Sequence, residues 1–331
     1  MNSYGRIFRV HIFGESHGEC VGITVDGCPA GLALHVDDFT ADIERRKPGA
    51  KGTTPRKEDD LPIFKSGLFN GKTTGAPITI LFENKNTRSA DYEKLRAVPR
   101  PGHADFTASQ KFGGFEDYRG SGHFSGRLTV CLVAAGVIAK KLLQTIQINS
   151  AILEIGGEKD MEKGLQKAID AKDSVGGIVE CRVKNLPSGL GEPFFDSVES
   201  LLSHAVFAIP AVRGIEFGTG FAAAKMFGSQ HNDALKDTTG NTFTNHAGGI
   251  VCGLTNNNEL VFRIAIKPTS STPIEQKTLN IETGEIEKFS VKGRHDLCIA
   301  LRVPVILEAV TAFVLVDLML LEQKIPRVIS N

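Results

Sequence analysis

The sequence predicts an α+β fold, in which each half of the chain contributes apolar strands followed by a long helix. Residues 7–13 and 20–25 are β-branched, apolar runs on either side of a glycine-containing turn, a pattern typical of paired strands. Residues 126–146 and 298–321 are long apolar segments that read as helices. Charged residues and a proline interrupt the second segment, so it indicates a buried core helix and not a membrane span.

Shorter elements connect these segments. Residues 84–125 are polar and rich in glycine, so we expect mostly loop and turn there. Such a length is unusual in a compact domain and favours a functional role. The remaining patterns predict helices at 37–47, 163–172 and 197–207, and strands at 78–83, 214–217 and 260–267.

Each half of the chain has apolar strands followed by a long helix. No linker or low-complexity segment separates the halves, so we expect one domain over residues 1–331. The sequence shows no strong internal repeat, but it leaves room for a structural pseudo-repeat, roughly 1–150 and 151–331.

The composition excludes several classes of protein. The formal net charge is zero, so there is no general attraction to nucleic acid or to acidic membranes, and any recognition of anions must be local. The six cysteines form no CxxC pair and no metal-binding spacing, which favours reduced thiols and no metal site. The N-terminus has no secretory or import signal, so we expect a cytoplasmic protein.

Residues 14–18, Gly-Glu-Ser-His-Gly, match the G-x-S-x-G pattern of a serine-hydrolase nucleophile elbow. An elbow must lead into a helix, whereas residues 20–25 predict a second strand, so a hairpin turn presenting Ser16 and His17 is favoured. His103 lies in a second turn, Arg100-Pro101-Gly102-His103-Ala104-Asp105. Histidine is well suited to proton transfer near neutral pH, and two histidines in such turns indicate acid-base chemistry.

Three groups of residues could bind anions. Arg45, Arg46 and Lys47 end a predicted helix, where the helix dipole also favours cations for structural reasons. Residues 119–127 form a glycine-rich approach to a helix start, whose free amides suit a phosphate or carboxylate. Residues 267–271 and 292–296 offer cationic and hydroxyl groups on turns, although each could equally be a surface turn.

Taken together, these segments resemble the chorismate synthase family over nearly the full length. The motifs that carry the resemblance occur in the family's order: GESHG, RRKPG at 45–49, NTRSADY at 86–92, RPGHAD at 100–105, DYRG at 117–120, GLGEP at 189–193, NHAGG at 245–249, KPTSS at 267–271 and RHD at 294–296. The resemblance implies a β-α-β sandwich with helices packed between antiparallel sheets, and a homotetramer. It also implies a 1,4-anti elimination of phosphate from 5-enolpyruvylshikimate 3-phosphate, giving chorismate for aromatic amino acid biosynthesis, with reduced FMN and no net redox change.

The resemblance also implies roles for individual residues. His17 would protonate or pair with the departing phosphate, His103 would hold the charge state of the reduced flavin, Asp296 would assist proton transfer, and Ser16 and Ser125 would form a proton relay. The expected substrate-binding residues are Arg45, Arg46, Arg127 and Arg294, and the expected flavin-binding residues are His123, Phe124, Ser125, Pro210, Ala211, Cys252, Lys267, Pro268, Thr269, Ser270, Ser271 and Arg294. No nicotinamide-binding fingerprint is visible, so we expect a separate flavin reductase, drawing on NADPH, to supply the reduced flavin.

The chain departs from the family pattern around the expected flavin site. His123 and Phe124 stand in a segment that commonly reads Arg-Ser-Ser-Ala-Arg, Leu132 replaces an arginine, Pro210 an asparagine and Cys252 a glycine. These substitutions predict fewer contacts to the flavin phosphate. They leave open a diverged paralogue that binds flavin or an anion without turnover. The Gly-Glu-Ser-His-Gly segment leaves open a second alternative, a serine hydrolase that uses Ser16.

Overall fold

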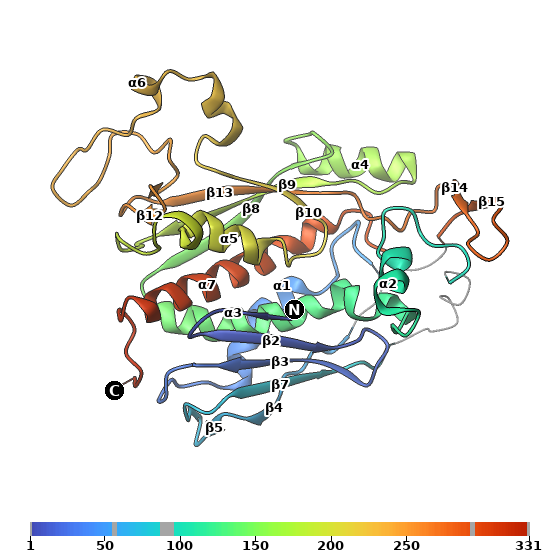
Figure 1. Cartoon of the computed structure of the whole chain (residues 1–331), viewed down its shortest axis with the longest axis horizontal. Helices are drawn as coiled ribbons and strands as arrows, with labels where there is room; N and C mark the ends of the chain where they lie inside the picture. Colours follow the sequence, from blue (N-terminus) through green and yellow to red (C-terminus); the bar gives the residue numbers. More distant parts are fainter. Residues whose placement is uncertain (1, 55–57, 87–95, 292–294, 330–331) are drawn as a thin grey trace.

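The computed structural model describes residues 2–54, 58–86, 96–291 and 295–329. Two antiparallel sheets enclose a layer of helices, as Figure 1 shows. The first sheet has the order β1-β2-β3-β7-β4, with strands Ser3–Tyr4, Arg9–Gly14, Cys20–Asp26, Ile78–Glu83 and Ile63–Ser66. The second has the order β10-β13-β9-β8, with strands Val212–Phe217, Leu260–Ile266, Gly177–Lys184 and Gln147–Ile155. The predicted α+β sandwich is confirmed.

The two sheets are wound in the same order. If the small pair β5 (Leu68–Phe69) and β6 (Lys72–Thr73) is set aside, the strands of the first half lie in the order first, second, fourth, third from β2. The strands of the second half follow the same order from β8, when β11 (Ile250–Val251) and β12 (Leu254–Thr255) are set aside. This correspondence is compatible with the pseudo-repeat, which stays a prediction together with the single-domain boundary.

Two long helices fill the space between the sheets. α3 (Thr129–Leu143) follows the first sheet and α7 (Val303–Leu321) follows the second, and they pack against each other along their length. Both are buried on nearly all sides, because each contacts a sheet as well as its partner helix. The segment Ile299–Leu321 is long and apolar enough to cross a membrane, but 89% of its apolar window is buried inside the protein, which confirms the predicted core helix.

Shorter helices complete the layer and cover the outside. α1 (Thr40–Arg46), which continues the 3-10 turn Val36–Phe39, packs against α3 and α7, and α5 (Val198–Val206) packs against α7. α4 (Met161–Ala171) lies on the outer side of the second sheet (Figure 1). α6 (Gly228–His231) lies on an excursion of residues 219–247 that projects beyond the sandwich.

The structure refines several sequence predictions. The described part of residues 84–125 is mostly loop and turn, as predicted, but it includes α2, which spans Asp105–Phe112 and ends at Gly113 in a left-handed conformation. This helix leaves Phe106 and Phe112 about half exposed, so it lacks the apolar face that periodicity detects. The helix predicted at 126–146 begins as a 3-10 turn, Gly126–Leu128, and ends at Leu143. The hairpin of β14 (Gln276–Leu279) and β15 (Ile286–Phe289) was not predicted, because it is short and largely exposed.

The crossing of α3 and α7 depends on a glycine. A Cβ atom placed on Gly136 would lie 2.2 Å from the Cβ of Ala309 and 2.4 Å from its Cα. Since neither helix can bend away without disturbing the sheet behind it, any larger side chain at position 136 must push the two halves apart.

We therefore expect Gly136→Ala to lower the free energy of unfolding by at least about 1 kcal/mol, although alanine alone favours a helix over glycine by about 1 kcal/mol. Urea unfolding followed by circular dichroism measures this. The control is Gly228→Ala in α6, where a new Cβ meets no atom within 4 Å. Equal stability of Gly136→Ala and the wild type would contradict the tight crossing.

Candidate active site

A cavity of about 800 Å³ opens where the two halves meet. The first half supplies His17 from the β2–β3 turn, Arg46 from the end of α1, and the loops around residues 98–104 and 120–127. The second half supplies residues 210–211 before β10, 267–271 after β13, 287–291 and the segment that leads into α7. Among the described lining residues, six carry a cationic side chain (Arg46, Arg100, Arg127, Lys267, Lys288 and Arg302) and four an acidic one (Glu58, Asp60, Glu287 and Asp296). The whole chain has no net charge, but positive side chains outnumber negative ones around this cavity.

Two buried arginines form one wall of the cavity. Asp60 accepts a hydrogen bond from Arg46 Nη2 at 2.7 Å through one carboxylate oxygen and is bonded to Arg127 Nη1 through the other. All three side chains are at most 4% exposed. Burial acts to raise the pKa of Asp60, but Arg46 and Arg127 outweigh it and hold that pKa below its usual value. One carboxylate therefore holds two guanidinium groups in place, and a net positive charge remains.

The two arginines differ in the donors that they have left. Arg127 also donates from Nε to Asn84 Oδ1 at 2.9 Å and from Nη2 to the Glu83 carbonyl at 3.1 Å. Arg46 donates from Nη1 to Thr129 Oγ1 at 3.1 Å, but its buried Nε has no hydrogen-bond partner within the described part of the chain. Burial lowers the pKa of Arg46 to about 10, so the group stays charged at neutral pH. A buried guanidinium with an unused donor is suited to receive an anion.

Asp296 lies on the α7 side of the cavity. One of its oxygens accepts from the Thr54 backbone amide at 2.8 Å and the other from Arg302 Nη1 at 3.1 Å. Arg302 also donates from Nε to the Arg46 carbonyl at 2.9 Å, which ties the start of α7 to the end of α1. The contacts fix Asp296 in the wall, 11% exposed.

His17 lies at the tip of the β2–β3 hairpin, 9% exposed, and lines the cavity. A Cβ on Gly120 would lie 2.3 Å from the His17 ring and 3.0 Å from Ser16 Oγ, so only glycine lets this loop approach both side chains. Gly120 has a φ of 57°, a conformation that also favours glycine. The predicted hairpin turn is confirmed, and the chain does not enter a helix after Ser16, as a hydrolase elbow would.

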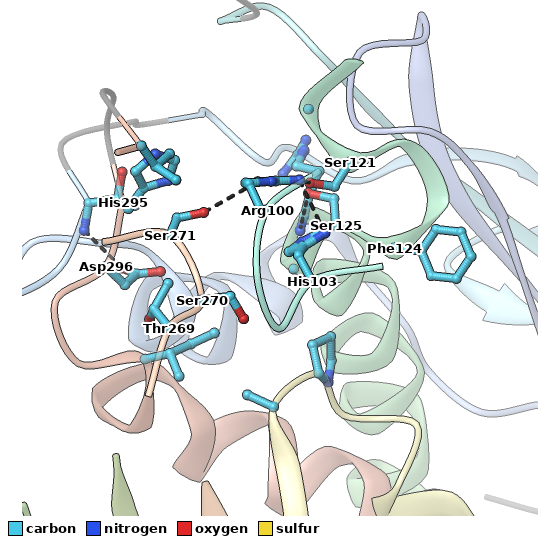
Figure 2. Close-up of a pocket in the computed structure, with 18 of the residues that line it drawn as sticks. Arg100, His103, Ser121, Phe124, Ser125, Thr269, Ser270, Ser271, His295 and Asp296 are labelled. Atoms are coloured by element: carbon cyan, nitrogen blue, oxygen red, sulfur yellow. Dashed lines mark hydrogen bonds between the residues drawn. The ribbon is translucent and has the colours of Figure 1, made fainter. Parts of the chain in front are cut away.

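A cluster around Arg100 joins three loops on the opposite wall (Figure 2). Arg100 is hydrogen-bonded to Asp105, to Ser121 Oγ at 2.8 Å and to Ser271 Oγ at 3.3 Å. His103 is bonded to the same Asp105 at 2.9 Å. The residues of the 267–271 loop are tied to this wall as well, because the Lys267 ammonium and Ser270 hydroxyl both donate to the Gly102 carbonyl, at 2.6 and 2.7 Å.

Most residues that the sequence singled out line this one cavity. They are His17, His103, Asp296, Ser125, Arg46, Arg127, Phe124, Pro210, Ala211 and the five residues Lys267, Pro268, Thr269, Ser270 and Ser271. Arg294 lies outside the described residues. No site role was expected for Asp60, Arg100 or Asp105. Asp60 leaves no local signal because it pairs with Arg127, 67 residues away, whereas Arg100 and Asp105 stand in the RPGHAD motif itself.

Four predicted site residues do not line the cavity. Ser16 is fully buried, and His123 Nδ1 donates to the Gly14 carbonyl at 2.9 Å, beside a smaller cavity of about 360 Å³ that Leu132 also lines. Cys252 is exposed in the turn between β11 and β12. Arg45 points to the other side of α1, where it binds Glu308. Their predicted roles in catalysis or ligand binding stay predictions.

Arg45 belongs to a charge cluster that joins the helix layer to the second sheet. Glu308 of α7, 3% exposed, accepts from Arg45 Nη1 and Nη2 at 2.7 Å, from Lys140 Nζ at 2.9 Å and from the Ser150 amide at 3.0 Å. Burial acts to raise the pKa of Glu308, but the cations outweigh it and the pKa is lowered. α1, α3 and β8 are thereby fixed to α7.

We expect Glu308→Gln to lower the free energy of unfolding by about 2 kcal/mol at pH 7, because the cations lose their charged acceptor. A carboxyl with a lowered pKa in the folded state stabilises the protein above its unfolded pKa, and that contribution disappears as the pH falls through the folded value. The difference between wild type and variant should therefore shrink below about pH 4.5. Urea midpoints between pH 7 and 3 measure it, with Glu322→Gln as the exposed control. A difference that grows on acidification would contradict the assignment.

The fold and the cavity together define a protein with a small-molecule site, around which cationic side chains outnumber acidic ones. Comparison with known proteins makes this specific: the family model described as "Chorismate synthase" matches residues 8–320, and the chain belongs to this family. A chorismate synthase of Chitinophaga pinensis is 70% identical over the full length of both chains, and one of Methanocaldococcus jannaschii is 42% identical over 97% of this chain and 96% of its own. A crystal structure of chorismate synthase superposes with a TM-score of 0.73 at 26% identity, covering 96% of this chain and 93% of the other.

Proposed function

We propose that this protein is a carbon-oxygen lyase that converts 5-enolpyruvylshikimate 3-phosphate to chorismate by 1,4-anti elimination of phosphate, with reduced FMN and no net redox change. The observation that carries the proposal is the cationic cavity between the two halves, in a chain that belongs to the chorismate synthase family. A substrate with one phosphate and two carboxylates needs fixed positive charges, and this cavity holds them in an otherwise neutral protein.

The cavity residues fit a bound flavin. The cavity, about 800 Å³ in volume, lies in the upper range of small-molecule sites, which leaves room for a flavin beside a substrate. Thr269 Oγ1, on the 267–271 loop, is buried and has no hydrogen-bond partner among the described residues. Lys267, Thr269 and Ser270 would hold the phosphate-bearing chain of FMN, and Phe124 and Ala211 would contact its ring. Reduced flavin supplies an electron-rich ring that lowers the cost of losing the phosphate.

The arginines would bind the substrate. Arg46 has donors to spare after Asp60 and Thr129 are satisfied, so it would meet a phosphate or carboxylate, with Arg127 beside it. Because Asp60 fixes both guanidinium groups before the substrate arrives, little reorganisation is needed when charge moves onto the departing phosphate. Arg294 is proposed to add a third contact.

The histidines would handle protons. His17 is proposed to donate a proton to the departing phosphate or to pair with it, and Ser16 and Ser125 to connect it with other groups. His103 faces the same cavity from the opposite loop, where it would stabilise the charge state of the reduced flavin. Asp296 would assist removal of the ring proton, held in place by Thr54 and Arg302.

The enzyme is proposed to act as a cytoplasmic homotetramer supplied with reduced FMN by a separate reductase. Several aromatic side chains of the 219–247 excursion support an oligomer, because Phe221, Phe227 and Phe243 are 71 to 83% exposed. Exposed apolar groups gathered on one segment are typical of surfaces covered by another chain.

Two measurements test the proposal together. With photoreduced FMN under anaerobic conditions, phosphate and chorismate should appear in equal amounts, and neither without reduced flavin. His17→Ala and His103→Ala should each lower kcat by at least about 10²-fold, the usual contribution of an acid-base group.

The control is His231→Ala on α6, which should turn over like the wild type. Near-wild-type kcat in both cavity variants would defeat the proposed proton roles. Binding of substrate and flavin by the wild type without either product would favour the non-catalytic paralogue, and labelling of Ser16 by an organophosphonate would favour the hydrolase.

A further inference from the structure

Asp105, the first residue of α2, binds two functional side chains at once. Its Oδ2 accepts from the Arg100 amide at 3.0 Å and from Arg100 Nε at 2.7 Å. Its Oδ1 accepts from Arg100 Nη2 at 2.6 Å and lies 2.9 Å from His103 Nδ1. The carboxylate is 13% exposed and the His103 side chain 22%, so water competes little for these bonds.

The hydrogen-bond partners determine where the His103 ring carries its proton. Nδ1 is also 3.1 Å from Arg100 Nη2, which can only donate, whereas Asp105 can only accept. The two hydrogens of Nη2 are already directed to Asp105 Oδ1 and to Ser121 Oγ. These two bonds, at 2.6 and 2.8 Å, are shorter than the 3.1 Å contact to Nδ1. An ionised carboxylate oxygen 2.9 Å from Nδ1 needs a hydrogen between the two atoms, so Nδ1 carries the proton and donates it to Asp105.

We infer that Asp105 is a positioning residue that holds His103 as the Nδ1–H tautomer and leaves Nε2 without a proton on the cavity side of the ring. The inference deepens the proposed function and rests on it, in that His103 is taken to act on a ligand bound in this cavity. No hydrogen bond from the described residues occupies Nε2, and His103 lines the cavity.

This arrangement sets what His103 can do. In the neutral ring Nε2 accepts a hydrogen bond or a proton from a cavity ligand. When Nε2 takes a proton, the Nδ1–H bond to the carboxylate remains and the positive ring stays paired. Burial acts to raise the pKa of Asp105, but hydrogen bonds from Arg100 and His103 outweigh it, so this pKa lies well below its usual range and the group stays ionised.

Asp105→Asn should reverse the tautomer. The amide oxygen is expected at the Oδ2 position, because two Arg100 donors converge there. The amide nitrogen then replaces Oδ1 and donates toward Nδ1, so the proton moves to Nε2 and the cavity meets a donor instead of an acceptor.

The decisive measurement is the 15N spectrum of the protein labelled with [15N]histidine, with His103 assigned by its loss in His103→Asn. In the wild type we expect the shifts of a protonated Nδ1 and an unprotonated Nε2, and in Asp105→Asn the reverse. A protonated Nε2 in the neutral wild-type ring would overturn the inference, whether or not the variant folds.

Turnover gives the second readout. We expect Asp105→Asn to lower kcat by about 10²-fold or more while KM for the substrate changes less than about 3-fold, because proton handling and not substrate binding is lost. Asp26→Asn, at an ion pair with Arg9 outside the cavity, is the control. Wild-type kcat in a folded Asp105→Asn would contradict the inference. Normal turnover of His103→Ala would instead contradict the proposed role of His103, and the spectrum would still decide the tautomer.

Discussion

The site depends on the crossing of α3 and α7. Gly136 and Ala309 bring the two helices into direct contact, and each helix carries a sheet on its outer side. The segments that lead into the helices, Gly126–Leu128 and Ile299–Arg302, both contribute to the cavity wall. Two helix N-termini therefore face one space. Their partial positive charges favour anions there, in addition to the charge of the arginine side chains.

Buried charge is costly, and the protein limits that cost by sharing carboxylates. Asp60 pairs with two guanidinium groups, Asp105 with Arg100 and His103, and Glu308 with Arg45 and Lys140. At Asp60 the sharing leaves positive charge toward the cavity, whereas the Glu308 cluster is remote from it and serves to join α1, α3 and β8 to α7. Arg45 and Arg46, neighbours in the sequence, thus lie on different sides of α1 and in two different environments.

Hydrophobic pattern and turn chemistry were enough to predict the strands β2, β3, β7, β10 and β13, the two long helices and the hairpin that presents His17. They did not predict the two longest strands, β8 and β9. The exact ends of helices and strands were not predictable from the sequence. Neither were the short strands and α2, because many of their residues are exposed and lack periodicity. In the site, the motifs on turns were recognisable from the sequence. Asp60, which positions Arg46 and Arg127, was not recognisable, since it is 67 residues from Arg127 in the chain and the two meet only in the folded protein.

The central claim is that pre-positioned guanidinium groups in this cavity bind the anions of the substrate. The most direct test is the Kd of 5-enolpyruvylshikimate 3-phosphate, measured by calorimetry with oxidised FMN present, for the wild type and Arg46→Lys. Lysine keeps the charge but loses the unused Nε donor, so we predict a Kd at least about 10-fold weaker, equivalent to about 1.4 kcal/mol. Arg182→Lys, which pairs with Glu180 and Glu259 away from the cavity, should bind like the wild type. An unchanged Kd in Arg46→Lys would contradict the account.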